Sequence, residues 1–213
     1  MQTQHENPTV YASGERGILD AAESLFAEKG FDAVSMSAIA RLAKTSKANI
    51  YHHFKNKNDL YLAIMKAAVK RSSVLLDAIQ EAPGTFRQRL ADFAAGQLDN
   101  ILSHRRSMQL VLRESLSGGS ESGREIARYA MAEVFSRLVE MVQRGQQQEE
   151  FRKDIDPTLA AFMIVSANTF YFQSVPVMQY IPELHFSEDA DMFSKSVMDI
   201  FFNGTLQEGE HKK

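Results

Sequence analysis

Residues 35–61 read SMSAIARLAKTSKANIYHHFKNKNDLY, and they contain two short amphipathic segments joined by a four-residue link at 43–46. Ser35 and Ser46 each precede a segment and are suited to cap the free amides of a helix start. The apolar residues that recur at helical spacing are Met36, Ile39, Ala40, Ile50 and Phe54. This pattern predicts a helix that ends near Ala43 and a second over 47–54, the layout of a helix-turn-helix, although such pairs also occur as plain packing units.

The flanking sequence extends this unit in both directions. Upstream, residues 17–29 place Ile18, Ala21, Ala22, Leu25 and Phe26 on one helical face. Gly30 supplies the left-handed residue after that helix and brings Phe31 back against Phe26. Downstream, Asn56 is suited to cap a long helix that runs to about Glu81, before Pro83 and Gly84.

The rest of the chain also has helical periodicity, divided by five prolines. We expect helices over about 85–103, 105–116, 122–149 and 157–174, a loop over 175–185, and a last helix capped by Ser187 that runs to about Gly204. No sustained alternation typical of strands occurs. The expected fold is all-α, with a helix-turn-helix domain over 1–57, ordered from about residue 14, and a larger helical domain over 58–213.

The charge is unevenly distributed. The 213 residues carry 24 basic and 27 acidic side chains, a net charge of -3, but residues 1–70 carry nine basic and seven acidic ones. No acid occurs from Ala33 to Asn58, where the basic residues are Arg41, Lys44, Lys47, Lys55 and Lys57. A basic segment on an acidic body is typical of a nucleic-acid partner, although a solvated face without a partner has the same pattern.

Other features of the sequence exclude whole classes of protein. The chain has no cysteine, which excludes a disulfide scaffold, a cysteine-ligated metal centre and a cysteine nucleophile. The first residues lack the basic and then apolar segments of a signal peptide. The most apolar run, 160–172, is interrupted by polar residues and does not predict a membrane-spanning helix. We therefore expect a cytoplasmic protein without a membrane partner or a cofactor.

Residues 46–61 closely resemble the recognition-helix signature of the TetR/AcrR transcriptional regulators. Residues 18–31 and 34–43 are similar to the first two helices of that family, so the specific resemblance covers Gly17 to Ile64. One departure is the turn, where the family has glycine and an apolar residue and this chain has Lys44 and Thr45. A residue other than glycine with positive φ costs about 1 kcal/mol there, and we expect Lys44 to add a phosphate contact.

The resemblance implies a dimeric transcriptional repressor that binds a palindromic operator in double-stranded DNA and is released by a small-molecule effector. Thr45 and Ser46 would bind phosphate at the start of the second short helix, and Ser35 at the start of the first. Lys47, Ala48, Asn49 and His52 would face the bases, since lysine can reach guanine, asparagine adenine and alanine a thymine methyl group. By resemblance Tyr51 and His53 hold flanking phosphates, and Lys55 and Lys57 extend this contact. A metal site at the two histidines lacks a third ligand.

The C-terminal part implied by the resemblance is a helical domain for effector binding and dimerisation. Residues 157–174 are apolar on two faces, so both faces need to be covered. The residues predicted for the homodimer interface are Ile164, Tyr171, Phe172, Phe193, Val197, Ile200 and Phe201. Those predicted for a largely apolar effector pocket are His104, Met108, Arg113, Met131, Phe135, Met163, Asn168 and Tyr171, although methionine and phenylalanine at helical spacing more often form a core.

Two other classes of function stay open at the level of sequence. A helical enzyme would use His52 and His53 as acid–base groups, but no nucleophile, phosphate-loop or metal motif accompanies them. A helical adaptor would bind an acidic protein through the basic segment. We expect a regulator without catalytic activity.

Overall fold

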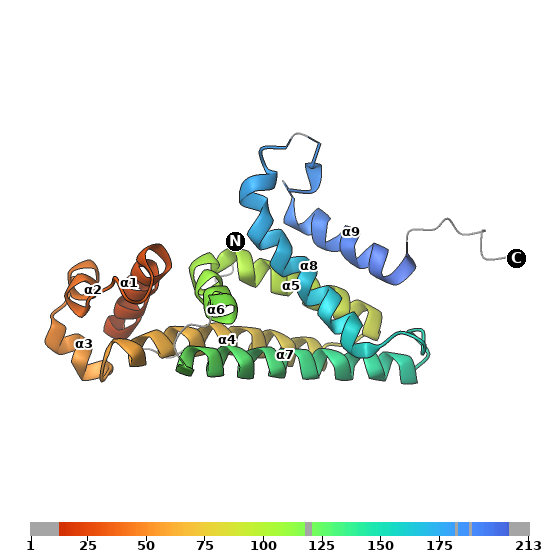
Figure 1. The fold of residues 1–213 in the computed structure, drawn as a ribbon. Coiled ribbons are helices and arrows are strands. Elements are labelled where there is room, and N and C mark those ends of the chain that lie inside the picture. The colour runs from red at the N-terminus through yellow and green to blue at the C-terminus, as the bar shows by residue number, and fades with distance from the viewer. Residues whose placement is uncertain (1–12, 118–120, 182, 188, 205–213) are drawn as a thin grey trace, which may run out of the picture. The chain divides into compact units, whose positions relative to one another are not determined.

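The computed structural model describes residues 13–117, 121–181, 183–187 and 189–204, and every regular element in these ranges is helical. Figure 1 shows α1 (Ser13–Lys29), α2 (Met36–Leu42), α3 (Lys47–His53), α4 (Lys57–Glu81), α5 (Phe86–Ser103), α6 (Arg105–Ser117), α7 (Glu121–Gln147), α8 (Pro157–Met178), the 3₁₀ turn η1 (His185–Ser187) and α9 (Ala190–Asn203). The predicted all-α class is confirmed. No helix in the described ranges is both long enough and apolar enough to cross a membrane.

The chain forms two compact units. The first unit comprises residues 1–70 and 105–129, and the second comprises residues 71–104 and 130–213. Helices α4 and α7 therefore contribute residues to both units. The predicted boundary between a DNA-binding and an effector-binding domain at residues 57 and 58 stays a prediction. The compact units follow packing instead, which groups α6 and the first turns of α4 with α1, α2 and α3.

The core of the first unit is built from the faces that the sequence predicts. Ile18, Phe26, Ile39 and Ile50 are each at most 1% exposed. Gly30 has φ 81° and its N–H donates to Phe26 O at 2.9 Å, so α1 ends as predicted. The Phe31 ring stacks on Phe26 with 5.7 Å between centroids.

Local hydrogen bonds fix the starts of three helices in this unit. Ser35 Oγ accepts from Ala38 N at 3.1 Å, and Ser46 Oγ accepts from Asn49 N at 3.0 Å. Asn56 Oδ1 accepts from Asp59 N at 2.8 Å. These three predicted caps are confirmed, and they explain why the short helices begin where they do.

Helix α6 is joined to α1 and α4 by polar contacts within the first unit. Ser107 donates to the Glu23 carboxylate, and Arg113 donates to the carbonyl oxygens of Phe26 and Ala27 at 3.2 and 3.3 Å. Tyr61 OH donates to Glu114 Oε1 at 2.6 Å, and both of these side chains are buried. Burial, then this hydrogen bond, raises the pKa of Tyr61 well above its usual value of 10.

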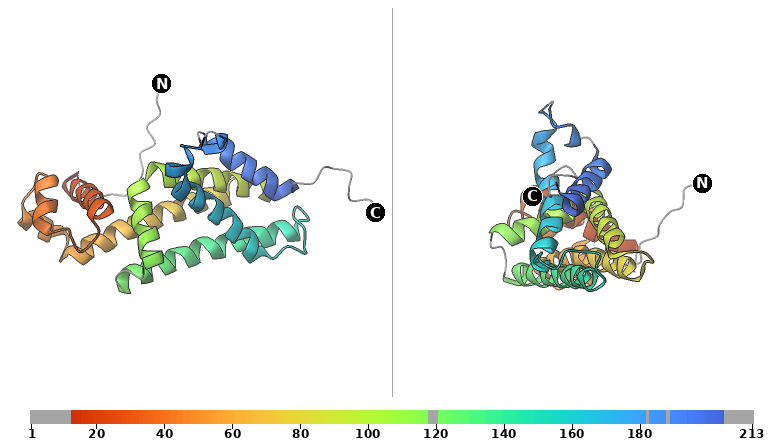
Figure 2. Two further views of the ribbon diagram at one scale, coloured as in Figure 1. Left: turned by 45° about the horizontal axis from the view of Figure 1, so that its top comes forward. Right: turned by 90° about the vertical axis from the view of Figure 1, so that its right-hand side faces the viewer.

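The second unit has its own core, to which α4, α5, α7, α8 and α9 contribute. Its fully buried side chains include Leu76, Leu90 and Leu138. Asn168 in α8 is also buried and donates to Ala94 O in α5 at 2.8 Å. This hydrogen bond fixes α8 against α5, and the two further views in Figure 2 show these helices crossing in close proximity.

Several helix boundaries differ from the prediction. Helix α1 begins at Ser13 rather than Gly17, and α9 is capped by Asp189, which accepts from Met192 N at 2.9 Å, rather than by Ser187. Helix α8 continues to Met178 although a loop was predicted from Val175. Pro176 lies in its last turn, and the helix continues beyond it because Gln179 N donates to Val175 O at 3.0 Å.

Candidate nucleic-acid interface

The exposed face of α3 is formed by residues that the sequence assigned to DNA. Ile50 is completely buried and fixes the helix by its opposite face. Lys47, Ala48, Tyr51 and His52 are exposed, Tyr51 to 52%. The left view of Figure 2 shows α1, α2 and α3 grouped at the N-terminal end of α4. A short helix that is packed against the core on one face and exposed to solvent on the other can enter a major groove.

The turn before α3 has the backbone conformation that makes Lys44 unusual. Lys44 has φ 51°, in the left-handed region where glycine is favoured. The N–H of Thr45 donates to Ala40 O at 2.9 Å and closes this turn. The turn is therefore closed without a glycine, and the exposed Lys44 side chain lies just before the α3 cap.

Polar groups at the start of α3 are already in contact with one another. Thr45 Oγ1 accepts from Asn49 Nδ2 at 2.9 Å, and Asn49 is half-buried. This hydrogen bond uses one of the two amide hydrogens of Asn49, so the second hydrogen remains for a contact to adenine. Ser46 and Ser35 use a hydroxyl oxygen as the helix cap, which leaves each hydroxyl hydrogen available for a phosphate oxygen.

Three of the predicted cations are available to a ligand. Lys44, Lys47 and Lys55 are exposed and form no salt bridge with a carboxylate in the described ranges. The nearest acid in sequence, Asp59, instead accepts from the backbone N–H of Lys55 at 3.0 Å. The positive charge of this surface is thus not neutralised from within the described chain.

The contacts of Lys57 differ from the phosphate contact that the sequence predicted for it. Its Nζ donates to the carbonyl oxygens of Phe31 at 2.8 Å, Val34 at 3.0 Å and Asp32 at 3.4 Å, and it lies 4.3 Å from the centre of the Phe31 ring. An ammonium group has three donor hydrogens, so this one is fully engaged. Lys57 holds the α1–α2 connection, and we assign it this structural role in place of a phosphate contact.

In the described part of the chain, His52 and His53 do not belong to a cluster of metal ligands. The His52 and His53 rings lie 5.2 Å apart with their planes at 76°. His52 is exposed and His53 is half-buried beside Phe54. The described part of the chain contains no group of three or more histidine, cysteine, aspartate or glutamate side chains placed to hold a metal ion.

The residues predicted for the effector pocket come from both compact units. Met108 and Arg113 belong to the first unit, and the others belong to the second. Asn168 is engaged with α5, His104 Nδ1 lies 3.0 Å from Asn100 O, and Met163 is 52% exposed. Phe135 stacks on Phe162, and Tyr171 packs on Phe193. The side chain of Met131 lies outside the described residues.

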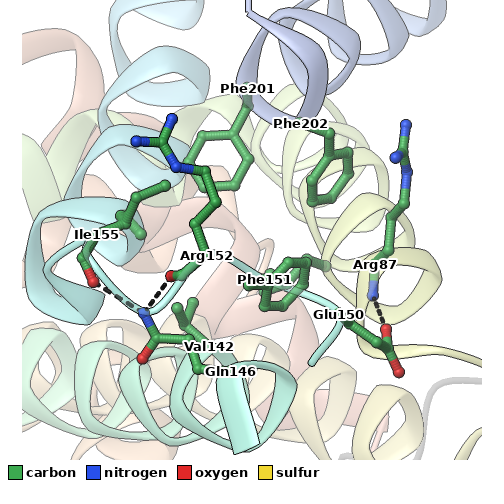
Figure 3. Close-up of a pocket in the computed structure, with 11 residues that line it drawn as sticks. Arg87, Val142, Gln146, Glu150, Phe151, Arg152, Ile155, Phe201 and Phe202 are labelled. Atoms are coloured by element: carbon green, nitrogen blue, oxygen red, sulfur yellow. Dashed lines mark hydrogen bonds between the residues drawn. The ribbon is translucent and has the colours of Figure 1, made fainter. Parts of the chain in front are cut away.

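A pocket in the second unit was not predicted. It has a volume of about 100 Å³ and lies among residues of α5, α7, α8, α9 and the α7–α8 connection (Figure 3). Its lining residues are Arg87, Leu90, Val142, Gln146, Glu150, Phe151, Arg152, Ile155, Ala160, Phe201 and Phe202. These residues come from three separate stretches of sequence, 87–90, 142–160 and 201–202, so no local motif could indicate the pocket.

The predicted dimer residues divide between the interior and the surface. Ile164, Tyr171 and Phe172 are at most 6% exposed because they pack inside the second unit. Phe193, Val197 and Phe201 are half-buried, and Ile200 is 53% exposed. The opposite face of α8 carries apolar side chains that are more than half exposed, namely Leu159, Phe162, Met163, Phe170 and Val177. This second apolar face of α8 was visible in the sequence.

Comparisons with known proteins agree with this arrangement. Residues 18–64 match the family of "bacterial regulatory proteins, tetR family", and residues 87–195 match the "tetracyclin repressor-like, C-terminal domain". The transcriptional regulator YdeS of Bacillus subtilis is 31% identical over 73% of this chain and 76% of its own length.

Two solved structures have the same fold. A putative fatty acid metabolism regulator of Clostridium perfringens has a TM-score of 0.78 at 15% identity, over 90% of this chain and all of that one. AibR, in complex with isovaleryl coenzyme A and operator DNA, has a TM-score of 0.70 at 22% identity, over 89% of this chain and 98% of its own.

Proposed function

Because this chain belongs to the TetR family of bacterial regulatory proteins, we propose that it binds an operator through the exposed face of α3 and represses transcription from that site. The observation that carries this proposal is the set of exposed residues on α3 and its preceding turn, within a segment that has no acid. In the first unit the exposed side chains of Lys44, Lys47 and Lys55 are available to phosphate.

The contacts divide into those that position the protein and those that read sequence. Tyr51, His53, Lys44 and Lys55 contact phosphates on either side of the major groove, with the hydroxyls of Ser35, Thr45 and Ser46 adding neutral contacts. Lys47, Ala48 and His52 face base edges, and Asn49 joins them through its second amide hydrogen. Each good bidentate contact to a base contributes about 1–3 kcal/mol of discrimination.

A homodimer would use the exposed apolar face of α8 together with Ile200 of α9. Side chains of this size that remain more than half exposed favour burial against a second copy. The two α3 helices of such a dimer would enter major grooves about 34 Å apart, or a multiple of it, on a palindromic operator. The two-fold symmetry of the protein would then be repeated in the DNA.

Release from DNA would follow from effector binding in the second unit. Support comes from α4, which contributes residues to both units, so that a ligand favouring one position of α4 shifts the population of DNA-binding states. We propose a largely apolar small molecule. AibR contains isovaleryl coenzyme A, and acyl thioesters are therefore the first class to screen against the protein–operator complex.

The experiment that tests DNA binding is selection of bound fragments from a random pool, followed by fluorescence-anisotropy titrations on the recovered sequence. The expected result is a palindrome, with an affinity that falls steeply as salt is raised. Lys47→Ala and Tyr51→Ala should weaken binding at least tenfold and leave the helical circular dichroism unchanged. Lys153→Ala is the matched control, since Lys153 is exposed in the second unit and pairs with Glu149.

Two results would overturn the proposal. If selection enriched no sequence and the titrations showed no salt-dependent binding, DNA would be removed as the partner. Alternatively, both α3 variants could bind as tightly as the unmodified protein, which would move the interface away from α3.

A further inference from the structure

The pocket in the second unit is small, largely apolar and held open by its own hydrogen bonds. Its floor is formed by the buried side chains of Leu90, Val142 and Ala160. Phe151 and Phe202 form an aromatic wall, with parallel rings whose centroids are 5.9 Å apart. Figure 3 shows these rings directed toward the same space, with Phe201 beside them.

The wall is positioned by the end of α7. The backbone N–H groups of Glu150 and Phe151 both donate to Gly145 O, at 2.9 and 3.3 Å. The Phe151 ring lies directly on Gly145, where an added Cβ atom would be 2.2 Å from the ring. Glu149 adopts φ 61° to make this reversal. Glycine at 145 therefore allows the close approach that places Phe151.

The α7–α8 connection is fixed by one side chain. Gln146 Nε2 donates to the carbonyl oxygens of both Arg152 and Ile155, each at 2.8 Å, as the dashed lines in Figure 3 show. Because the connection forms one side of the pocket, this amide holds the cavity in shape without a ligand. A preformed apolar cavity loses little conformational entropy when it is filled.

A cation at the pocket lacks an acidic partner. The Arg87 guanidinium lies 4.7 Å from the centre of the Phe202 ring and donates to the neutral Asn203 Oδ1 at 3.1 Å. Glu150 accepts from the backbone N–H of Arg87 at 3.0 Å, and in Figure 3 the guanidinium points away from that carboxylate. Within the described ranges Arg87 forms no ion pair, so its charge is available to a ligand.

Arg152, the second arginine at the pocket, has an acidic partner. Arg152 donates to both carboxylate oxygens of Asp154, from Nε at 3.1 Å and from Nη2 at 2.6 Å. These two contacts neutralise its charge in the same planar geometry that a ligand carboxylate would use. Arg87 is therefore the group that would bind an anion here.

We propose that this pocket binds a small monocarboxylate with a compact apolar body, such as a single aromatic ring or a short branched alkyl group. The carboxylate pairs with Arg87, and the apolar body packs between Phe151, Phe202 and the buried floor. An apolar cavity of about 150 Å³ in another protein accepts benzene, so about 100 Å³ with one open side fits a group of this size. A long acyl chain does not fit.

This site is distinct from the residues predicted for the effector pocket, and the proposal does not depend on DNA binding. None of the lining residues is among those eight predicted residues. A monocarboxylate is favoured over a neutral molecule because Arg87 supplies an unneutralised charge. It is favoured over a polyanion because Glu150 lies at the rim and would repel a second negative group.

The probe for the test is benzoate, with neutral benzamide as the matched ligand control. Saturation-transfer NMR on the full chain measures contact between the protein and the aromatic protons of each ligand, without operator DNA. We expect transfer to benzoate at millimolar concentration and at least fivefold less transfer to benzamide. No transfer to benzoate, or equal transfer to both, would overturn the proposal.

Two variants test the charged part and the apolar part of the pocket separately. Arg87→Gln retains the backbone N–H that contacts Glu150 and should reduce transfer to benzoate at least fivefold, whereas Arg144→Gln removes an exposed arginine of α7 outside the pocket and should change nothing. Ile155→Trp fills the cavity from a position that is 37% exposed, and it should also abolish transfer. Unchanged transfer in Arg87→Gln and Ile155→Trp would place benzoate elsewhere and refute the assignment.

Discussion

Replacing Lys57 by methionine distinguishes a structural lysine from a DNA-binding one. Methionine keeps the length and the apolar stem of the side chain but removes the ammonium group. That group donates to Phe31 O, Val34 O and Asp32 O and lies over the Phe31 ring. We therefore expect Lys57→Met to destabilise the first unit and to leave the phosphate contacts unchanged.

The size of the effect follows from these contacts. A hydrogen bond to a charged group contributes about 1.5–3 kcal/mol, and the cation–π contact contributes about 0.5–1 kcal/mol at a partly exposed site. The three hydrogen bonds share one ammonium group, and Asp32 is exposed, so water replaces part of what is lost. The expected decrease in the free energy of unfolding is about 2–3 kcal/mol.

Urea denaturation followed by circular dichroism measures this loss, and anisotropy titrations at several salt concentrations measure the phosphate contacts. Lys55→Met is the matched control, because the Lys55 side chain is exposed and precedes Lys57 by two residues. It should leave stability unchanged and reduce the slope of log affinity against log salt by about 0.9. If Lys57→Met instead reduced that slope and retained full stability, the structural role of Lys57 would be refuted.

Three further substitutions test other parts of the structure. Lys44→Gly should raise the free energy of unfolding by about 1 kcal/mol, because Lys44 has φ 51°, while anisotropy shows weaker operator binding. Tyr61→Phe should lower stability by about 2 kcal/mol by removing the hydrogen bond to Glu114. Because the pKa of Tyr61 is raised in the folded state, its contribution is present below pH 10 and is lost as pH rises above 10; urea titrations across that range should show a smaller decline for the variant. Phe162→Glu should convert a dimer to a monomer in sedimentation velocity, whereas Gln143→Glu, at an exposed position on α7 outside the proposed interface, should not.

The parts of the fold that the sequence predicts are those fixed by contacts between near neighbours. Ser35, Ser46 and Asn56 each cap a helix through an amide three residues away, so sequence spacing alone determines the hydrogen bond. Lys44 stands where the resembled family has glycine, and it has a positive φ of 51°. In the candidate interface, exposure on α3 follows from the helical period around Ile50.

The parts that sequence did not predict depend on groups that are distant along the chain. The carbonyl oxygens that engage Lys57 lie 23 to 26 residues before it, and a charge pattern does not distinguish a lysine on the surface from one that closes a connection. Asn168 was predicted as a pocket anchor and instead donates to Ala94 O in another helix. On α8 the sequence indicated two apolar faces but not which one the core would cover.

The packing of the first unit also changes what an independent helix-turn-helix domain must contain. Leu60, Tyr61 and Leu110 are at most 1% exposed and belong to the same core as Phe26 and Ile50, although all three lie beyond residue 57. A fragment that ended at residue 57 would expose that core, and it would leave the α1 carbonyl oxygens without the Arg113 guanidinium. Burying three large apolar side chains contributes roughly 1.5–3 kcal/mol each, an amount comparable to the total stability of a small domain. The helix-turn-helix therefore requires the start of α4 and residues 107–114 of α6 for its own folding, and a displacement of either segment would alter the packing beneath α3.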